Sequence, residues 1–156
     1  MNAGAFGHWE KNYEEKDLTI VLQKSEKGVS CVSAVGEMLA KSRNLNVSQS
    51  EILGIIGEPA PIHRLRVLLN DMDSPKAGAG WHSGMRIEAD IEFIRGRKNF
   101  AVILKEFGSE AHAVFIKGFE DQLMVLDTFD QSRYEMTVEE FQKVWTGAYI
   151  FYDEDK

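Results

Sequence analysis

The chain has 156 residues, a length that suits one domain with a hydrophobic core of its own. Hydrophobic residues make up 44% and charged residues 28%, a balance that argues against disorder, collagen-like repeats and coiled coil. With 18 Lys and Arg against 25 Asp and Glu, the net charge is −7, so we expect no non-specific nucleic-acid binding. A single cysteine excludes an internal disulfide and a Cys-rich zinc site.

The start of the chain carries no signal-peptide pattern, and no run of about 18 apolar residues occurs anywhere. We therefore expect no membrane insertion. The pattern indicates a cytoplasmic protein, or a domain excised from a larger secreted protein. Residues 1–17 show no clear period and predict a loosely structured lead-in, followed by one domain over residues 18–156.

The first half of the chain predicts mainly helices. Apolar residues recur at three- and four-residue steps after Cys31, which places this cysteine at the start of a helix that Asn44 and Asn46 end. Ser48–Glu51 has the form of a capping box and opens a second helix, which stops before Pro59. A third short helix is expected over Ile62–Leu69.

Two other segments of this half do not predict helices. Leu18–Leu22 is short, β-branched and bounded by charged residues, which favours a strand or an extended arm. Residues 70–85 are rich in turn formers and predict a long loop around Trp81 and His82. Because long loops often carry function, this loop is a candidate pocket rim, although a Trp that covers a helix junction explains it equally well.

The second half predicts a sheet. After a short helix around Ile91, three apolar runs predict antiparallel strands joined by glycine-containing turns. These runs are Phe100–Leu104, Ala111–Ile116 and Leu123–Leu126. Thr137–Glu140 is a second capping box that opens a helix ending at Trp145, and Ala148–Tyr152 is a terminal strand. The order of helices first and sheet second predicts an α+β fold.

Cys31 is the candidate nucleophile. A thiol at the N-terminus of a helix feels the partial positive charge of unpaired N–H groups, which favours the thiolate. His112 begins one predicted strand and Asp127 follows the next, so a hairpin would let the carboxylate fix the tautomer of the imidazole. Gln23 precedes the Cys31 loop, and its side-chain NH₂ could join the Cys31 backbone N–H as an oxyanion donor.

Each of these residues has a simpler interpretation. A lone cysteine is commonly a small buried hydrophobe, a strand His or a turn Asp is commonly structural, and Gln23 can be a solvated loop residue. The other histidines have no spacing typical of a metal site, so neither a metal nor a cofactor is expected. Four cations alternate with acidic residues, which favours a solvated helix face over a nucleic-acid site: Arg86, Arg95, Arg97 and Lys98.

The order of the candidate residues resembles a known family, the papain-like cysteine peptidases of the double-glycine, bacteriocin-leader-processing type. The likeness covers roughly residues 18–152 and rests on four motifs in this order: Gln23, Gly28–Val35, His112–Gly118 and Val125–Asp127. A Trp145–Gly147 turn before the closing strand continues it. The resemblance implies a papain-like fold in which N-terminal helices pack on a C-terminal antiparallel sheet.

The resemblance also implies roles for four residues. Cys31 would be the nucleophile, His112 its general base and later acid, Asp127 the orienting group and Gln23 the oxyanion donor. The implied reaction is cysteine-dependent acyl transfer on an amide bond of a peptide or protein substrate, with water or another nucleophile as acceptor and no cofactor.

This sequence departs from the family pattern at three places. The step of eight positions from Gln23 to Cys31 is longer than the usual one, Val32 stands where Gly is common, and Thr128 stands where Pro is common. Two alternatives remain open. The chain also resembles papain-fold bacterial toxin or effector domains, which act in a target cell and are neutralised by an immunity protein, and it could be a catalytically inactive binding module.

Overall fold

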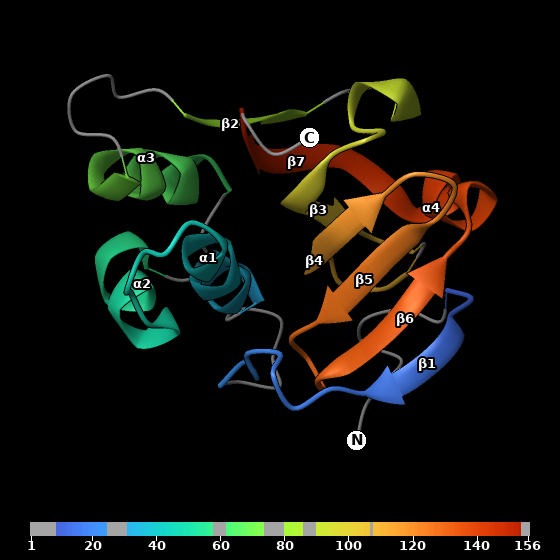
Figure 1. The fold of residues 1–156 in the computed structure, drawn as a ribbon, viewed down its shortest axis with the longest axis horizontal. Helices are drawn as coiled ribbons and strands as arrows, with labels where there is room; N and C mark the ends of the chain where they lie inside the picture. The colour runs from blue at the N-terminus through green and yellow to red at the C-terminus, as the bar shows by residue number, and fades with distance from the viewer. Residues whose placement is uncertain are drawn as a thin grey trace.

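The computed structural model describes residues 9–24, 31–57, 62–73, 80–85, 90–106 and 108–153. Helices and strands follow one another within these ranges as β1 (Asn12–Lys16), α1 (Cys31–Ser42), α2 (Gln49–Ile56), α3 (Ile62–Asp73), β2 (Trp81–Met85), the 3-10 helix η3 (Ile91–Phe93), β3 (Lys98–Leu104), β4 (His112–Phe119), β5 (Leu123–Asp127), β6 (Ser132–Met136), α4 (Val138–Val144) and β7 (Trp145–Tyr152). Figure 1 shows α1, α2 and α3 grouped beside the sheet, which confirms the predicted α+β fold.

The seven strands form one antiparallel sheet in the order β1-β6-β5-β4-β3-β7-β2. The three strands predicted from apolar runs are its central members β3, β4 and β5. In the β4–β5 hairpin, Phe115 lies opposite Leu126, so the start of β4 and the end of β5 meet at the same end of the sheet. The predicted pairing that would bring His112 to Asp127 is therefore present.

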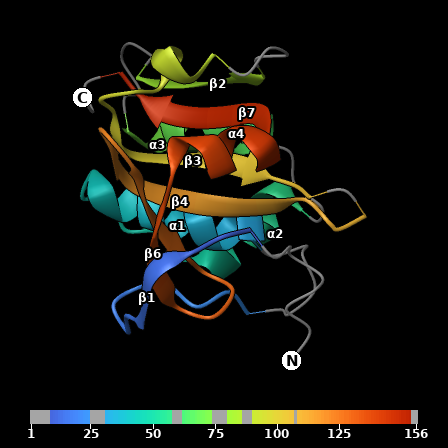
Figure 2. The same cartoon turned by 90° about the vertical axis from the view of Figure 1, so that its right-hand side faces the viewer.

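Apolar side chains form one core on each face of the sheet. One core lies between the sheet and the helices α1, α2 and α3, where Leu39, Ile52 and Leu65 are fully buried. The other joins α4 and the N-terminal Trp9 to the opposite face. Figure 2 shows this arrangement, with α4 in front of β3 and β7 and α3 behind them. Burial on both faces explains why the central strands are nearly continuous apolar runs in the sequence.

Polar caps begin two of the helices, as predicted. The Ser48 side chain accepts from the backbone N of Glu51, whose carboxylate accepts from the backbone N of Ser48, which completes the capping box of α2. Thr137 caps α4 by accepting from the backbone N of Glu140. The second capping box is only half formed, because the Glu140 carboxylate accepts instead from the backbone N of Glu10, 3.0 Å away.

The N-terminal segment is more ordered than predicted. Residues 12–16 form β1 on the edge of β6, and Trp9 is only 3% exposed, so the prediction of a loosely structured lead-in over residues 1–17 is wrong for this part. The strand β6 was not predicted either, although alternate residues of Ser132–Met136 are buried. β1 carries mainly charged and polar residues, so its pairing depends on the β6 edge rather than on its own pattern.

Leu18–Leu22 is not a strand. Asp17 closes a turn here, since its carboxylate accepts from both the backbone N and the hydroxyl of Thr19. Its backbone carbonyl also accepts from the N of Ile20. The chain then runs through residues 21–24 without regular structure, which agrees with the alternative of an extended arm.

Both described ends of the long loop predicted over residues 70–85 lie mostly in regular structure, while residues 74–79 lie outside the described residues. Helix α3 continues to Asp73, and Trp81 and His82 lie in the edge strand β2. The Asn70 side chain accepts from the backbone N of Gly80 and of Trp81 and donates to the carbonyl of Trp81. Trp81 is buried in the core between α3 and the sheet, so it covers a junction and does not line a pocket rim.

Candidate active site

Cys31, His112 and Asp127 come together where α1 and β4 begin and β5 ends. The Sγ of Cys31 lies 3.5 Å from the backbone N of Ala113, which donates to it. The Nε2 of His112 lies 2.7 Å from Oδ1 of Asp127. All three side chains are buried, and His112 is 0% exposed. A thiol, an imidazole and a carboxylate thus lie together in one buried place, an arrangement that can support nucleophilic catalysis.

His112 and Asp127 stabilise each other's charged forms. Burial lowers the pKa of His112, but the Asp127 carboxylate and hydrogen bonds to Asp127 and Cys31 outweigh it and raise that pKa to about 10. Burial raises the pKa of Asp127, but the His112 charge and hydrogen bonds hold it below its ordinary value. At neutral pH the pair is therefore imidazolium and carboxylate. Because Nε2 is engaged by Asp127, Nδ1 is the nitrogen that can exchange a proton with the thiol.

Three residues that were not predicted complete the surroundings of Asp127, two by direct contact and one through Tyr134. The hydroxyl of Tyr134, on β6, donates to Oδ2 of Asp127 over 3.3 Å, and Nε1 of Trp9 donates to that hydroxyl over 2.9 Å. The backbone N of Phe129 donates to Oδ1 over 3.0 Å. Burial and the Asp127 charge raise the pKa of Tyr134 well above its ordinary value, so the hydroxyl stays a donor.

Aromatic rings shield the imidazole. The ring of Trp9 stacks on His112 at a centroid distance of 6.4 Å and an interplanar angle of 20°, and Phe129 meets it edge-on at 6.3 Å. Trp9 therefore both covers His112 and holds Tyr134. The sequence around Trp9 gives little indication of this role, because Trp9 and His112 lie 103 positions apart in the chain.

Gln23 lies next to the same group of residues. It is 6% exposed, its backbone N donates to the carbonyl of Thr128 over 2.8 Å, and its Oε1 accepts from the Thr128 hydroxyl over 3.2 Å. With Oε1 held in this way, the NH₂ group is the donor end of the side chain. Residues 25–30 lie outside the described residues, so the oxyanion role of Gln23 stays a prediction.

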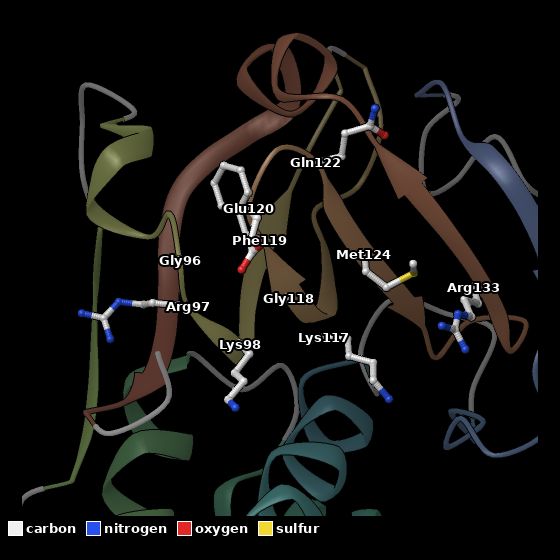
Figure 3. A pocket seen from close by; sticks show the side chains of 10 residues that line it. All are labelled: Gly96, Arg97, Lys98, Lys117, Gly118, Phe119, Glu120, Gln122, Met124 and Arg133. Carbon is white, nitrogen blue, oxygen red and sulfur yellow. The ribbon is translucent and has the colours of Figure 1, made fainter.

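An open cleft of about 510 Å³ lies at the far end of β4 from His112. Figure 3 shows Lys98, Lys117 and Arg133 around it, while the Arg97 guanidinium points away. That guanidinium stacks 3.6 Å from the Phe151 ring centroid, and Arg97 is only 9% exposed. Its lining contains none of Cys31, His112 and Asp127, so the cleft lies apart from these three residues.

The three interleaved cations that lie in described residues do not form the predicted solvated helix face. Arg95 pairs with Glu92 at 2.9 Å, but Arg97 is buried against Phe151 and Lys98 begins β3. Arg86 lies outside the described residues. No group of three or more His, Cys, Asp and Glu side chains is arranged to hold a metal ion in the described part of the chain. Within the same residues, every helix is too short or too polar to cross a bilayer.

Sequence comparison relates the chain to a cysteine protease. No family profile matches it. Cysteine protease effector 1 of Escherichia coli O1:K1:H7 is 29% identical over 155 residues, which are 97% of this chain and 30% of that protein. The chain thus spans less than a third of the length of the curated relative that it matches.

Solved structures with the same architecture are peptidase domains of transporters. A double-glycine motif protease from an AMS/PCAT transporter, in complex with the leader peptide, aligns with a TM-score of 0.65 and 15% identity over 91% of this chain and 92% of the other. The chain has the double-glycine peptidase fold. The peptidase domain of Streptococcus ComA, a bifunctional ABC transporter, also has this fold, with a TM-score of 0.60 and 22% identity over 85% of this chain and 95% of that one.

The double-glycine peptidase fold confirms the papain-like architecture that the residue order predicted. In this fold the N-terminal helices pack beside the antiparallel sheet, as the helices α1, α2 and α3 do here. The sequence relative adds a link to cysteine proteases.

Proposed function

We propose that this chain is a cysteine peptidase or amidase in which Cys31, His112 and Asp127 act as a triad. The observation that carries this proposal is the buried His112–Asp127 pair, 2.7 Å apart, beside the thiol at the start of α1. The likeness to a cysteine protease effector and the double-glycine peptidase fold support the same chemistry.

The reaction would proceed in two acyl-transfer steps. The Cys31 thiolate attacks the amide carbon, and the C–N bond breaks as the His112 imidazolium gives its proton to the leaving amine, which leaves a thioester. His112 then takes a proton from water, whose oxygen attacks the thioester, and the C–S bond breaks to release the carboxylic acid and restore the thiolate and the imidazolium. Asp127 keeps the imidazole oriented, and Gln23 would donate to the oxyanion of both steps.

A peptide is the proposed substrate class. The AMS/PCAT protease of the same fold was solved in complex with the leader peptide, which supports binding of a peptide. The same steps acting on a glutamine side chain would release ammonia, so deamidation of a protein is a variant of this reaction and not a separate mechanism.

A second candidate function is an effector domain. The sequence relative carries the name effector and is much longer than this chain, which favours a catalytic domain that is delivered into a target cell. An immunity or inhibitor protein would then be its partner. We expect expression of the active chain to inhibit the growth of a host cell and Cys31→Ala not to inhibit it. Co-expression with a cognate inhibitor should restore growth.

Labelling with a peptide acyloxymethyl ketone, read by intact mass, tests the proposed triad. We expect one label per chain in the wild type, none in Cys31→Ala and at least a tenfold slower rate in His112→Ala. His82→Ala is the matched control, because His82 is half-exposed and pairs with Asp153 away from this site. Equal labelling of wild type and His112→Ala would favour an inactive binding module with an ordinary thiol.

A further inference from the structure

The segment that carries Gln23 needs support from outside its own loop. Eight positions separate Gln23 from Cys31. A longer loop constrains its ends less, because the entropy of closure grows with length. An oxyanion donor must nevertheless lie within about 2.7–3.1 Å of the developing charge. Other contacts must therefore fix the position of Gln23.

Gln49 supplies such contacts from the first residue of α2. Its Nε2 donates to the carbonyl of Leu22 over 2.7 Å, and its Oε1 accepts from the backbone N of Lys24 over 3.1 Å. One side chain thus holds the two peptide groups that flank Gln23. Gln49 is only 6% exposed, and both backbone groups would lose this hydrogen-bond partner if its side chain were removed.

The same residue is tied to the helix of the nucleophile. The backbone N of Gln49 donates to Oε1 of Glu37 over 2.7 Å, and Glu37 lies on α1, which begins at Cys31. The other carboxylate oxygen of Glu37 pairs with Lys41 at 3.2 Å. Thr128 holds Gln23 from the opposite side, next to Asp127. A continuous set of polar contacts therefore links the Cys31 helix to the arm that carries Gln23.

We propose that Gln49 is a positioning residue for the oxyanion site, acting through Gln23. This proposal rests on the proposed function, since it assigns Gln49 a part in stabilising the oxyanion of the acyl-transfer steps. Gln49 touches neither substrate nor thiol. It holds the peptide groups on both sides of Gln23 and is itself held by Glu37 on α1, so it would set the distance between the Gln23 amide and the Cys31 backbone N–H.

Two reactions of the same thiol test this role. Acylation of Cys31 by p-nitrophenyl acetate passes through an oxyanion, whereas alkylation by iodoacetamide displaces iodide without one. In Gln49→Leu we expect acylation to slow by about 10- to 100-fold, because a displaced donor loses most of its effect. We expect alkylation to stay within about twofold of wild type, because the thiol and His112 are untouched.

A double-mutant cycle with Gln23→Ala shows whether Gln49 acts through Gln23. Once the amide is gone, adding Gln49→Leu should slow acylation no further. Gln131→Leu is the matched control, because Gln131 donates to the same arm at Ile20, over 2.9 Å, before the arm reaches Gln23. It should leave acylation within about threefold of wild type. If Gln49→Leu fails to fold, Gln49→Glu keeps an acceptor for Lys24 and should slow acylation selectively as well.

The failures of the two proposals are distinguishable. A wild-type chain that p-nitrophenyl acetate does not acylate at Cys31 overturns the proposed function and this inference with it. Normal acylation of the wild type together with an equal fall of both reactions in Gln49→Leu, or additive losses in the cycle, overturns only the positioning role.

Discussion

The Nε2 of His112 donates to Oδ1 of Asp127 over 2.7 Å, although the two residues lie 15 positions apart and on different strands. Their meeting follows from the antiparallel pairing of β4 with β5. Because both side chains are buried, their attraction is little screened by water. The pair can therefore keep the imidazole both charged and oriented beside Cys31, which underlies the predictions below.

Replacing Asp127 by Asn should abolish most activity. The amide can no longer balance the charge of His112, and its NH₂ can stabilise the wrong tautomer of the ring. We expect the rate of amide cleavage to fall by about 10³- to 10⁴-fold. Cleavage of a peptide amide, followed by mass spectrometry, measures the loss. Asp121→Asn, in the exposed β4–β5 turn, should behave as wild type. A loss below tenfold would contradict the orienting role.

Removing the Tyr134 hydroxyl should weaken the site without destroying it. In Tyr134→Phe, both Oδ2 of Asp127 and Nε1 of Trp9 lose a partner. We expect the free energy of unfolding to fall by about 1–3 kcal/mol, and acylation of Cys31 to slow by roughly 3- to 10-fold. Urea unfolding and the acylation rate measure these effects. Tyr13→Phe, on an exposed ring of β1, should change neither; identical behaviour of both variants would refute the role.

Stability should fall on the alkaline side because of His112. Its pKa is about 10 in the folded chain against an ordinary value of 6.5, so its contribution is complete below about pH 6.5 and disappears as the pH rises through about 10. The free energy of unfolding should therefore decrease by up to about 1.4 kcal/mol per pH unit in this window.

Urea unfolding at several pH values checks this dependence, with His112→Gln as the comparison. The variant should lack the alkaline slope. Asp127 acts in the opposite sense, because its lowered pKa contributes stability above its ordinary value of 3.8 that is lost as the pH falls through the folded pKa. Equal alkaline slopes in wild type and variant would mean that His112 is not charged in the folded state.

Asn70 should be a stability residue with no part in the chemistry. Its side chain makes three hydrogen bonds to the backbone of Gly80 and Trp81 and so joins α3 to β2. Asn70→Ala should lower the free energy of unfolding by about 2–4 kcal/mol, since buried backbone groups lose their partners. The reactivity of Cys31 in the folded variant should be unchanged. The exposed neighbour Asp71→Ala should cost less than about 0.5 kcal/mol.

Local patterns in the sequence were sufficient for the elements whose own residues decide their structure. The apolar period after Cys31, the capping box at Ser48 and the apolar runs of β3, β4 and β5 all predicted what the structure contains. These elements bury apolar side chains in the two cores, so the spacing of apolar residues in the sequence shows their periodicity. The order of Cys31, His112 and Asp127 likewise indicated the fold that the solved peptidase domains share.

Tertiary structure alone decided the rest, because it depends on partners far away in the chain. The strand β1 forms only because β6 offers an edge, and β2 only because β7 does. The same holds for Tyr134 and Gln49, whose importance lies in what they touch and not in their neighbours in sequence. The order of residues in the sequence can suggest a triad. Only the packing of a helix end against two paired strands brings a thiol, an imidazole and a carboxylate together in one buried place.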